Sequence, residues 1–111
     1  MIVGYYDPLG KLEDSGFLER LSEIGYGCEE MEEWRMGIED GTPIPKKIVS
    51  YPDRDFFNGK SVFGMFVRDF PRTTFYIIVG NSEDKLMGES NFGCSDRIRY
   101  YNSLDEVMKE I

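Results

Sequence analysis

Two short hydrophobic runs in the middle of the chain predict neighbouring β-strands. Residues 61–67 (SVFGMFV) are almost all apolar or Gly, and residues 75–79 (FYIIV) are all apolar. Continuous runs of this length, rich in Val, Ile, Phe and Tyr, are typical of strands covered on both faces. Asn58-Gly59 before the first run and Pro71 between the runs are typical of turns. We therefore expect consecutive antiparallel strands, joined as hairpins over 54–68 and 60–79, at about 54–57 (with 47–51 as an extension), 60–68 and 73–79.

Helical spacing of apolar residues predicts a helix near each end of the chain. Ser15 can cap a helix by accepting from a backbone N–H, and Phe17 and Leu21 follow four residues apart. Ser103 and Glu106 have the spacing of a capping box ahead of a short apolar face. We expect helices at 16–24 and 103–111.

Residues 26–41 (YGCEEMEEWRMGIEDG) fit two patterns. As a helix over about 28–35, Cys28, Met31 and Trp34 form an apolar stripe and the Glu residues face outward. As a strand, Trp34, Met36 and Ile38 alternate toward an Asp-Gly turn. We expect the helix.

The remaining segments complete a small α+β fold. Residues 1–6 and 95–101 are typical of short strands, and residues 81–94 (NSEDKLMGESNFGC) are typical of a polar loop. The expected fold is an antiparallel sheet of four to five strands with two or three short helices packed on it. The 111 residues are expected to form one compact domain, with an acidic first part (1–45) and a sheet-rich second part (46–111). The chain shows neither a secretion-signal pattern nor the roughly 20 apolar residues of a membrane span, so we expect a cytoplasmic protein.

The net charge of −8 arises entirely in the first part of the chain. Residues 1–45 contain eleven acidic and three basic residues, whereas residues 46–111 contain ten of each. A basic groove for nucleic acid is therefore not expected, and we predict no direct binding to nucleic acid. Acidity of this kind can also serve solubility alone.

The residue types that most often perform catalysis or hold metals are scarce. There is no His, which removes the commonest general base and metal ligand. The two cysteines, Cys28 and Cys94, cannot complete a structural zinc site, and we expect both thiols to be free. The sequence therefore predicts no catalytic residue, no cofactor and no metal site.

One enzymatic pattern is present in part. Pro52-Asp53 followed by Glu83-Asp84-Lys85 resembles the PD…ExK signature of the Mg²⁺-dependent nuclease superfamily. The resemblance implies that the carboxylates would hold the metal and that Lys85 would polarise the attacked phosphate or water. That family places the acid and the Lys along a strand, whereas Gly80-Asn81-Ser82 interrupts the strand before Glu83. A nuclease-like enzyme is therefore the second alternative function.

The most distinctive feature is a cluster of acidic residues around the only Trp, which we call the acidic belt. It consists of Glu29, Glu30, Glu32, Glu33, Trp34, Glu39 and Asp40. Like charges three and four residues apart destabilise a helix by roughly 0.2–0.5 kcal/mol per pair, so their retention indicates a use. We expect the belt to bind a basic partner, because the charges would speed encounter and the aromatic ring would supply affinity. The alternative is a solvated helix face with Trp34 in the core.

By size and charge, the chain is similar to acidic cytosolic inhibitors, namely toxin-immunity proteins and phage proteins that block host nucleases or other host defences. We therefore expect a non-enzymatic inhibitor that docks on a basic protein, such as a nuclease or another nucleic-acid-binding protein. The first alternative is a structural or assembly protein that self-associates through its sheet as a homodimer, because two short helices would leave apolar strand surface uncovered.

Overall fold

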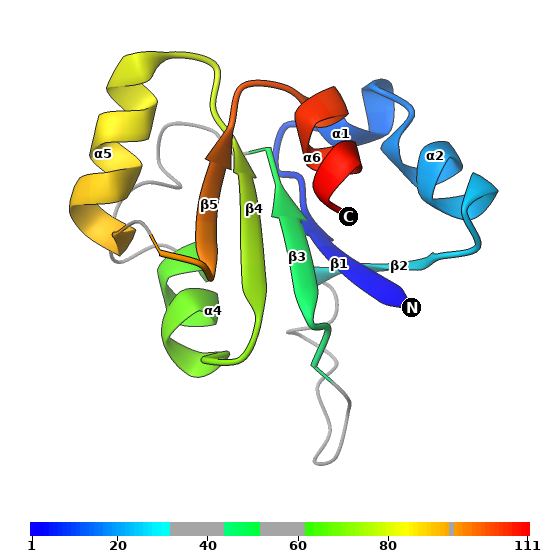
Figure 1. Ribbon diagram of the computed structural model, residues 1–111, viewed down its shortest axis with the longest axis horizontal. Helices are drawn as coiled ribbons and strands as arrows, with labels where there is room; N and C mark the ends of the chain where they lie inside the picture. The colour runs from blue at the N-terminus through cyan, green and yellow to red at the C-terminus, as the bar shows by residue number, and fades with distance from the viewer. Residues whose placement is uncertain (32–43, 52–61, 94) are drawn as a thin grey trace.

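Five parallel strands form a single sheet in the computed structural model, which describes residues 1–31, 44–51, 62–93 and 95–111. The strands are β1 (Ile2–Tyr6), β2 (Gly27–Glu30), β3 (Lys47–Ser50), β4 (Thr74–Ile78) and β5 (Ile98–Tyr101), and their order is β2-β1-β3-β4-β5 (Figure 1). The described helices are α1 (Lys11–Asp14), α2 (Phe17–Glu23), α4 (Val62–Asp69), α5 (Ser82–Phe92) and α6 (Leu104–Glu110). The expected antiparallel α+β fold is therefore wrong, and the protein is a parallel α/β fold.

The parallel arrangement explains why the strands are so apolar. In β4, the four residues from Phe75 to Ile78 are all buried, because helices cover both faces of the sheet. Parallel neighbours cannot be joined by tight hairpins and need long crossovers, most often helical. One lateral row across the sheet contains Glu29, Gly4, Ile48, Phe75 and Ile98.

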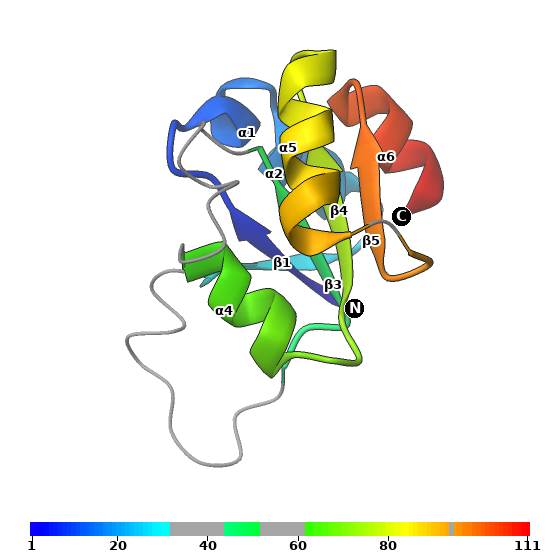
Figure 2. The same ribbon diagram turned by 90° about the vertical axis from the view of Figure 1, so that its left-hand side faces the viewer.

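The sheet separates two hydrophobic cores. Val3, Val49 and Ile78 on one face pack against side chains of α1, α2 and α6, including Leu12, Phe17, Leu21 and Val107. The other face packs against α4 and α5, with Phe66 and Phe70 in its buried core. Figure 2 shows α4 and α6 on opposite sides of the sheet.

The expected strand at 60–68 is wrong, and with it the hairpins over 54–68 and 60–79. Residues 62–69 form α4, in which Phe66 and the following Phe70 lie one turn apart with stacked rings 5.5 Å between centres. Both are buried, whereas Arg68 and Asp69 are exposed. The expected strand at 54–57 and the Asn58-Gly59 turn lie outside the described residues. Since residues 62–67 are helical, the uncovered strand surface invoked for a homodimer loses its basis, and self-association stays a prediction.

The expected loop at 81–94 is also wrong, because it contains the longest described helix, α5. The Asn81 side chain begins this helix by accepting a hydrogen bond of 2.8 Å from the Asp84 N–H. Gly93, at a φ of 80°, follows its last turn.

Several other expectations are confirmed. Strands occur within the predicted segments 1–6, 47–51, 73–79 and 95–101, and helices within 16–24 and 103–111. Ser103 caps α6 as predicted, by accepting from the Glu106 N–H at 3.3 Å. The predicted helix at about 28–35 is wrong where it can be compared, because residues 27–30 form β2 and residues 32–35 lie outside the described part. None of the described helices is long and apolar enough to cross a bilayer.

Candidate functional site

Two members of the acidic belt lie on β2, at one edge of the sheet. Glu29 is exposed and Glu30 is half-buried. In the strand register Glu29 is beside Gly4 and Glu30 is beside Tyr5, so their side chains point to opposite faces. The other predicted site residues, namely Glu32, Glu33, Trp34, Glu39 and Asp40, lie outside the described residues. The structure therefore places the start of the belt on a strand edge.

The elements around β2 extend this acidic surface. Residues 1–31, which form β1, α1, α2 and β2, contain seven acidic and only two basic residues. Four of the acidic residues on the two helices are exposed: Glu13, Asp14, Glu19 and Glu23. One of the two bases, Arg20, is paired with Asp105 of α6 at 2.7 Å. The helices and the β2 edge thus form one acidic side, drawn on the right in Figure 1.

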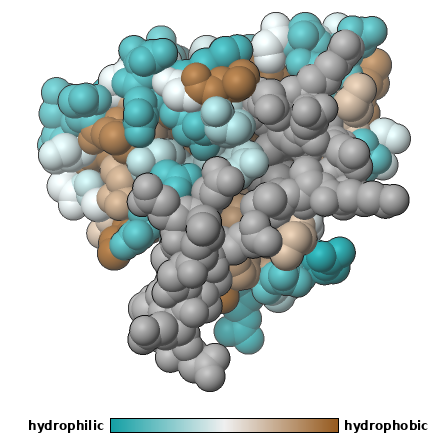
Figure 3. Space-filling model, turned by 180° about the vertical axis from the view of Figure 1, so that it is seen from behind, coloured by the Kyte–Doolittle hydropathy of each residue, from teal (hydrophilic) through white to brown (hydrophobic). Residues whose placement is uncertain are grey.

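Exposed apolar residues accompany the charges at the same edge. Met1, Ile2 and Ile24 are 57%, 53% and 51% exposed. Ile2 and Met1 are next to β2, since Ile2 is beside Gly27 in the strand register and the Gly27 N–H donates to the Met1 carbonyl at 2.9 Å. Ile24 follows α2, shortly before β2 begins. In the rear view, hydrophobic groups appear among hydrophilic ones on the left, the side of β2 and the N-terminus (Figure 3). We call Met1, Ile2, Glu23, Ile24 and Glu29 the β2-edge surface.

The apolar members of this surface were missed in the sequence because Met1 and Ile2 resemble the start of a buried strand. The alternation of β1 gave the available signal, since Val3 and Tyr5 face one core and place Ile2 on the opposite face. Gly4 on that opposite face is buried against Met31, whereas Ile2 is exposed.

Cys28 lies on β2 but faces inward, where it packs against the core beneath α1 and α2. Its thiol is free, as the sequence predicted, and burial raises the pKa of the Cys28 thiol above its ordinary value. Cys94 lies outside the described residues. A raised pKa makes Cys28 a weaker nucleophile at neutral pH than an exposed thiol.

The carboxyl ends of the strands are the usual ligand site of parallel α/β sheets, at the point where the strand order reverses. Here that point lies between β1 and β3. Asp7 follows β1, and its carboxylate accepts from the backbone N–H groups of Leu12 and Glu13 at 3.1 Å. After β3, the Tyr51 ring lies 5.0 Å from the Lys11 ammonium. Asp7 thus accepts hydrogen bonds from N–H groups in the first turn of α1, as Asn81 does for α5.

Ser50, the last residue of β3, has an unusual environment at the same point. Its side chain is fully buried, and its hydroxyl has no hydrogen-bond partner among the residues that the structure describes. It lies beside Tyr6 on β1 and Ile77 on β4. A buried hydroxyl without a partner normally reduces stability, so Ser50 is not explained by packing alone.

The described residues of the nuclease-like pattern do not lie on a strand, as that family requires. Glu83, Asp84 and Lys85 lie in the first turn of α5 rather than along a strand, and Asp53 lies outside the described residues. Within the parts of the chain that the structure describes, no three His, Cys, Asp or Glu side chains are placed to share a metal ion.

Comparisons with known proteins assign no family to this chain. No family model, no curated protein and no solved structure matches it. Function must therefore be inferred from the surfaces and side chains described above.

Proposed function

We propose that this protein is a non-enzymatic inhibitor that docks on a basic protein partner through its acidic side. One observation supports the proposal above the others: exposed apolar and acidic residues occur together near the β2 edge, where Ile2 is on the same face of the sheet as Glu29 and Ile24 directly follows Glu23 in the chain. Protein interfaces commonly combine an apolar centre with a polar rim. Ile2 and Ile24 suit the centre of such a contact, and Glu23 and Glu29 suit its rim.

The charges would act mainly on the rate and orientation of binding. An acidic side attracts a basic partner over about one Debye length, roughly 8 Å at physiological ionic strength. The apolar residues would supply affinity once the surfaces meet. Acidic residues on an edge strand also oppose pairing with a second copy, because two such edges repel each other. Both effects favour a basic partner over self-association.

The test compares two charge-reversed variants that change the net charge equally. Glu23→Lys with Glu29→Lys alters the β2-edge surface. Asp69→Lys with Asp96→Lys alters exposed acids elsewhere, and within the described residues Asp69 forms an exposed 3.7 Å pair with Arg68. Both variants should keep the fold, since exposed ion pairs contribute about 0–1 kcal/mol.

Each protein is used to capture partners from extracts of the source cells, and captured proteins are quantified by mass spectrometry. We expect the wild type and the Asp69/Asp96 variant to capture the same basic protein, and the Glu23/Glu29 variant to lose it. The purified partner's activity should fall as one equivalent of wild-type protein is added. Equal capture by both variants, or capture without any change in the partner's activity, would reject the proposal.

The apolar contribution is tested separately with Ile2→Ser and Ile24→Ser. Because both side chains are more than half exposed, stability should change by less than about 0.5 kcal/mol. The dissociation rate from the captured partner should rise, whereas the Glu23/Glu29 variant should mainly slow association.

A further inference from the structure

A pocket of about 250 Å³ lies at the opposite end of the sheet from the strand carboxyl ends. It is formed where the chain enters β3 and where it turns from α4 into β4. The described lining residues are Ile44, Pro45, Lys46, Phe70, Pro71, Arg72 and Thr73. This position is separate from both the β2-edge surface and Ser50.

Hydrogen bonds tie the two walls of the pocket together. The Thr73 hydroxyl, which is buried, donates to the Pro45 carbonyl at 2.8 Å, and the Thr74 N–H donates to the Lys46 carbonyl at 2.9 Å. The Thr73 N–H donates to the Phe70 carbonyl at 3.2 Å and so closes the turn. The pocket is therefore formed in advance, which lowers the entropic cost of binding a ligand.

A further connection comes from the residue that directly precedes β5. The Arg97 guanidinium donates to the carbonyls of Val67 and Phe70 at 3.3 and 3.1 Å, at the carboxyl end of α4. These bonds hold the end of α4, and with it the Phe70 wall, against the sheet.

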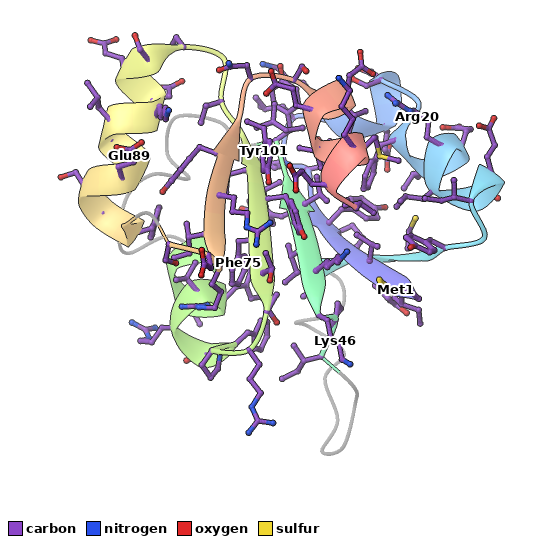
Figure 4. All side chains as sticks on the ribbon, viewed as in Figure 1. Met1, Arg20, Lys46, Phe75, Glu89 and Tyr101 are labelled. Carbon is purple, nitrogen blue, oxygen red and sulfur yellow. The ribbon has the colours of Figure 1, made fainter. Side chains whose placement is uncertain are left out.

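The chemistry of the pocket is apolar inside and cationic at its mouth. Phe70 and Pro45 are buried, whereas Lys46 and Arg72 are exposed. Figure 4 shows Lys46 below the lower end of β3. Neither cation forms an ion pair with an acidic residue in the described ranges 1–31, 44–51, 62–93 and 95–111. Two such cations beside an apolar pocket are notable in a protein with a net charge of −8.

We propose that this pocket binds a small organic carboxylate with an apolar body, such as an aryl or short alkyl carboxylate. The apolar body would pack on Phe70 and Pro45, and the carboxylate would lie between Lys46 and Arg72. Small-molecule sites commonly combine an apolar lining with a few charged groups that fix orientation. An engineered cavity of about 150 Å³ in another protein admits benzene, so about 250 Å³ accommodates a ring with a short side chain.

The first experiment compares three compounds by two-dimensional NMR of the ¹⁵N-labelled protein: 3-phenylpropionate, its neutral amide, and acetate. At about 1 mM, 3-phenylpropionate should shift the amide signals of Lys46, Arg72 and Thr73, but not those of Asp7 or Asn81. The amide should bind about tenfold more weakly, because charge-assisted hydrogen bonds are lost, and acetate should cause no shift. Equal binding of acid and amide would indicate a site for apolar groups only and would overturn the proposal. Shifts confined to Asp7 and Asn81, or no shifts at all, would also overturn it.

The second experiment uses matched variants. Lys46→Glu with Arg72→Glu removes the cations at the mouth. Arg68→Glu with Lys109→Glu changes the net charge equally at exposed residues that do not line the pocket. The Lys46/Arg72 variant should bind 3-phenylpropionate at least about tenfold more weakly, and the control should bind it within about twofold of the wild type. An equal loss in both variants would show a general charge effect and refute the site. Both results are independent of the β2-edge proposal.

Discussion

Replacing Ser50 by Ala should stabilise this protein, although Ser50 is fully buried. Its hydroxyl lacks a hydrogen-bond partner within the described part of the chain, and an unsatisfied buried polar group costs about 1–3 kcal/mol. Ala removes that group and leaves a void no larger than one water, roughly 10–15 Å³. At about 24 cal/mol per Å³, the void costs roughly 0.2–0.4 kcal/mol. The expected net gain in the free energy of unfolding is therefore about 1 kcal/mol.

Thr73→Val provides the matched comparison, because Thr73 is the other buried Ser or Thr among the described residues. Its hydroxyl donates to the Pro45 carbonyl at 2.8 Å, so the substitution leaves that carbonyl without its partner. The predicted change is a loss of about 1–3 kcal/mol. The two substitutions, each removing one buried hydroxyl, should thus change stability in opposite directions.

Urea unfolding followed by far-ultraviolet circular dichroism measures both changes. Ser50→Ala should raise the urea midpoint without changing the slope, and should raise Tm by about 4 °C or more. A loss of 1 kcal/mol or more in Ser50→Ala would refute the reasoning. It would show that the Ser50 hydroxyl makes a favourable interaction in solution, for example with an ordered water.

Three further predictions concern other contacts. Gly4→Ala should destabilise the protein by about 1–3 kcal/mol, because the added Cβ would lie 2.6 Å from the Met31 sulfur. In the same unfolding assay Gly27→Ala should be nearly neutral, because the nearest atom to its Cβ would be 3.5 Å away. Asp7→Ala should cost about 1 kcal/mol by removing the acceptor at the start of α1, and an unchanged Tm would contradict that role. The raised pKa of the Cys28 thiol predicts slow alkylation at neutral pH, and the alkylation rate should increase as pH rises. Because the folded protein holds this thiol proton more tightly than the unfolded chain does, the free energy of unfolding should fall above the ordinary thiol pKa. Peptide mass spectrometry of the native protein would follow the alkylation, and a rate equal to that of glutathione would contradict burial.

The sequence predicted most element positions but not the sheet. Phe17 and Leu21 are four residues apart and buried, and Ser103 caps α6, so these local signals sufficed for two helices. The predicted Ser15 cap was wrong, because Gly16 precedes α2 and the Ser15 hydroxyl, at the end of α1, instead donates to the Lys11 carbonyl. The strand at 73–79 was also predictable from its continuous apolar run. Its parallel pairing was not, because a strand buried on both faces carries no period-2 pattern that tells the direction of its neighbours.

The most consequential wrong prediction was the strand assigned to the apolar run 61–67. A short apolar stretch can be a strand or a buried helix, and its periodicity does not separate the two. Phe66 and Phe70 are four residues apart, which is the spacing of one helix face, but Pro71 is also typical of a turn between two strands. Taking this segment as helix replaces a hairpin by a crossover between β3 and β4, and the whole topology follows.

The loop predicted at 81–94 failed for a different reason. Helix α5 is polar, and only a few of its side chains, such as Met87 and Phe92, contact the core. Its signals were at its ends: Asn81 three residues before Asp84, and Gly93 after the last turn. For the candidate site, the charge excess of residues 1–45 was visible in the sequence, but its placement on the edge strand β2 required the sheet order.

The strand order has a consequence for the way this chain acquires its sheet during synthesis. After β1 leaves the ribosome, β2 can pair with one side of it, and β3 can then pair with the other. β4 next adds to β3, and β5 adds to β4. None of the five described strands has to be inserted between two strands that have already paired. Parallel sheets fold slowly because each pairing closes a long loop, and here these closures can occur one at a time, in the order of translation.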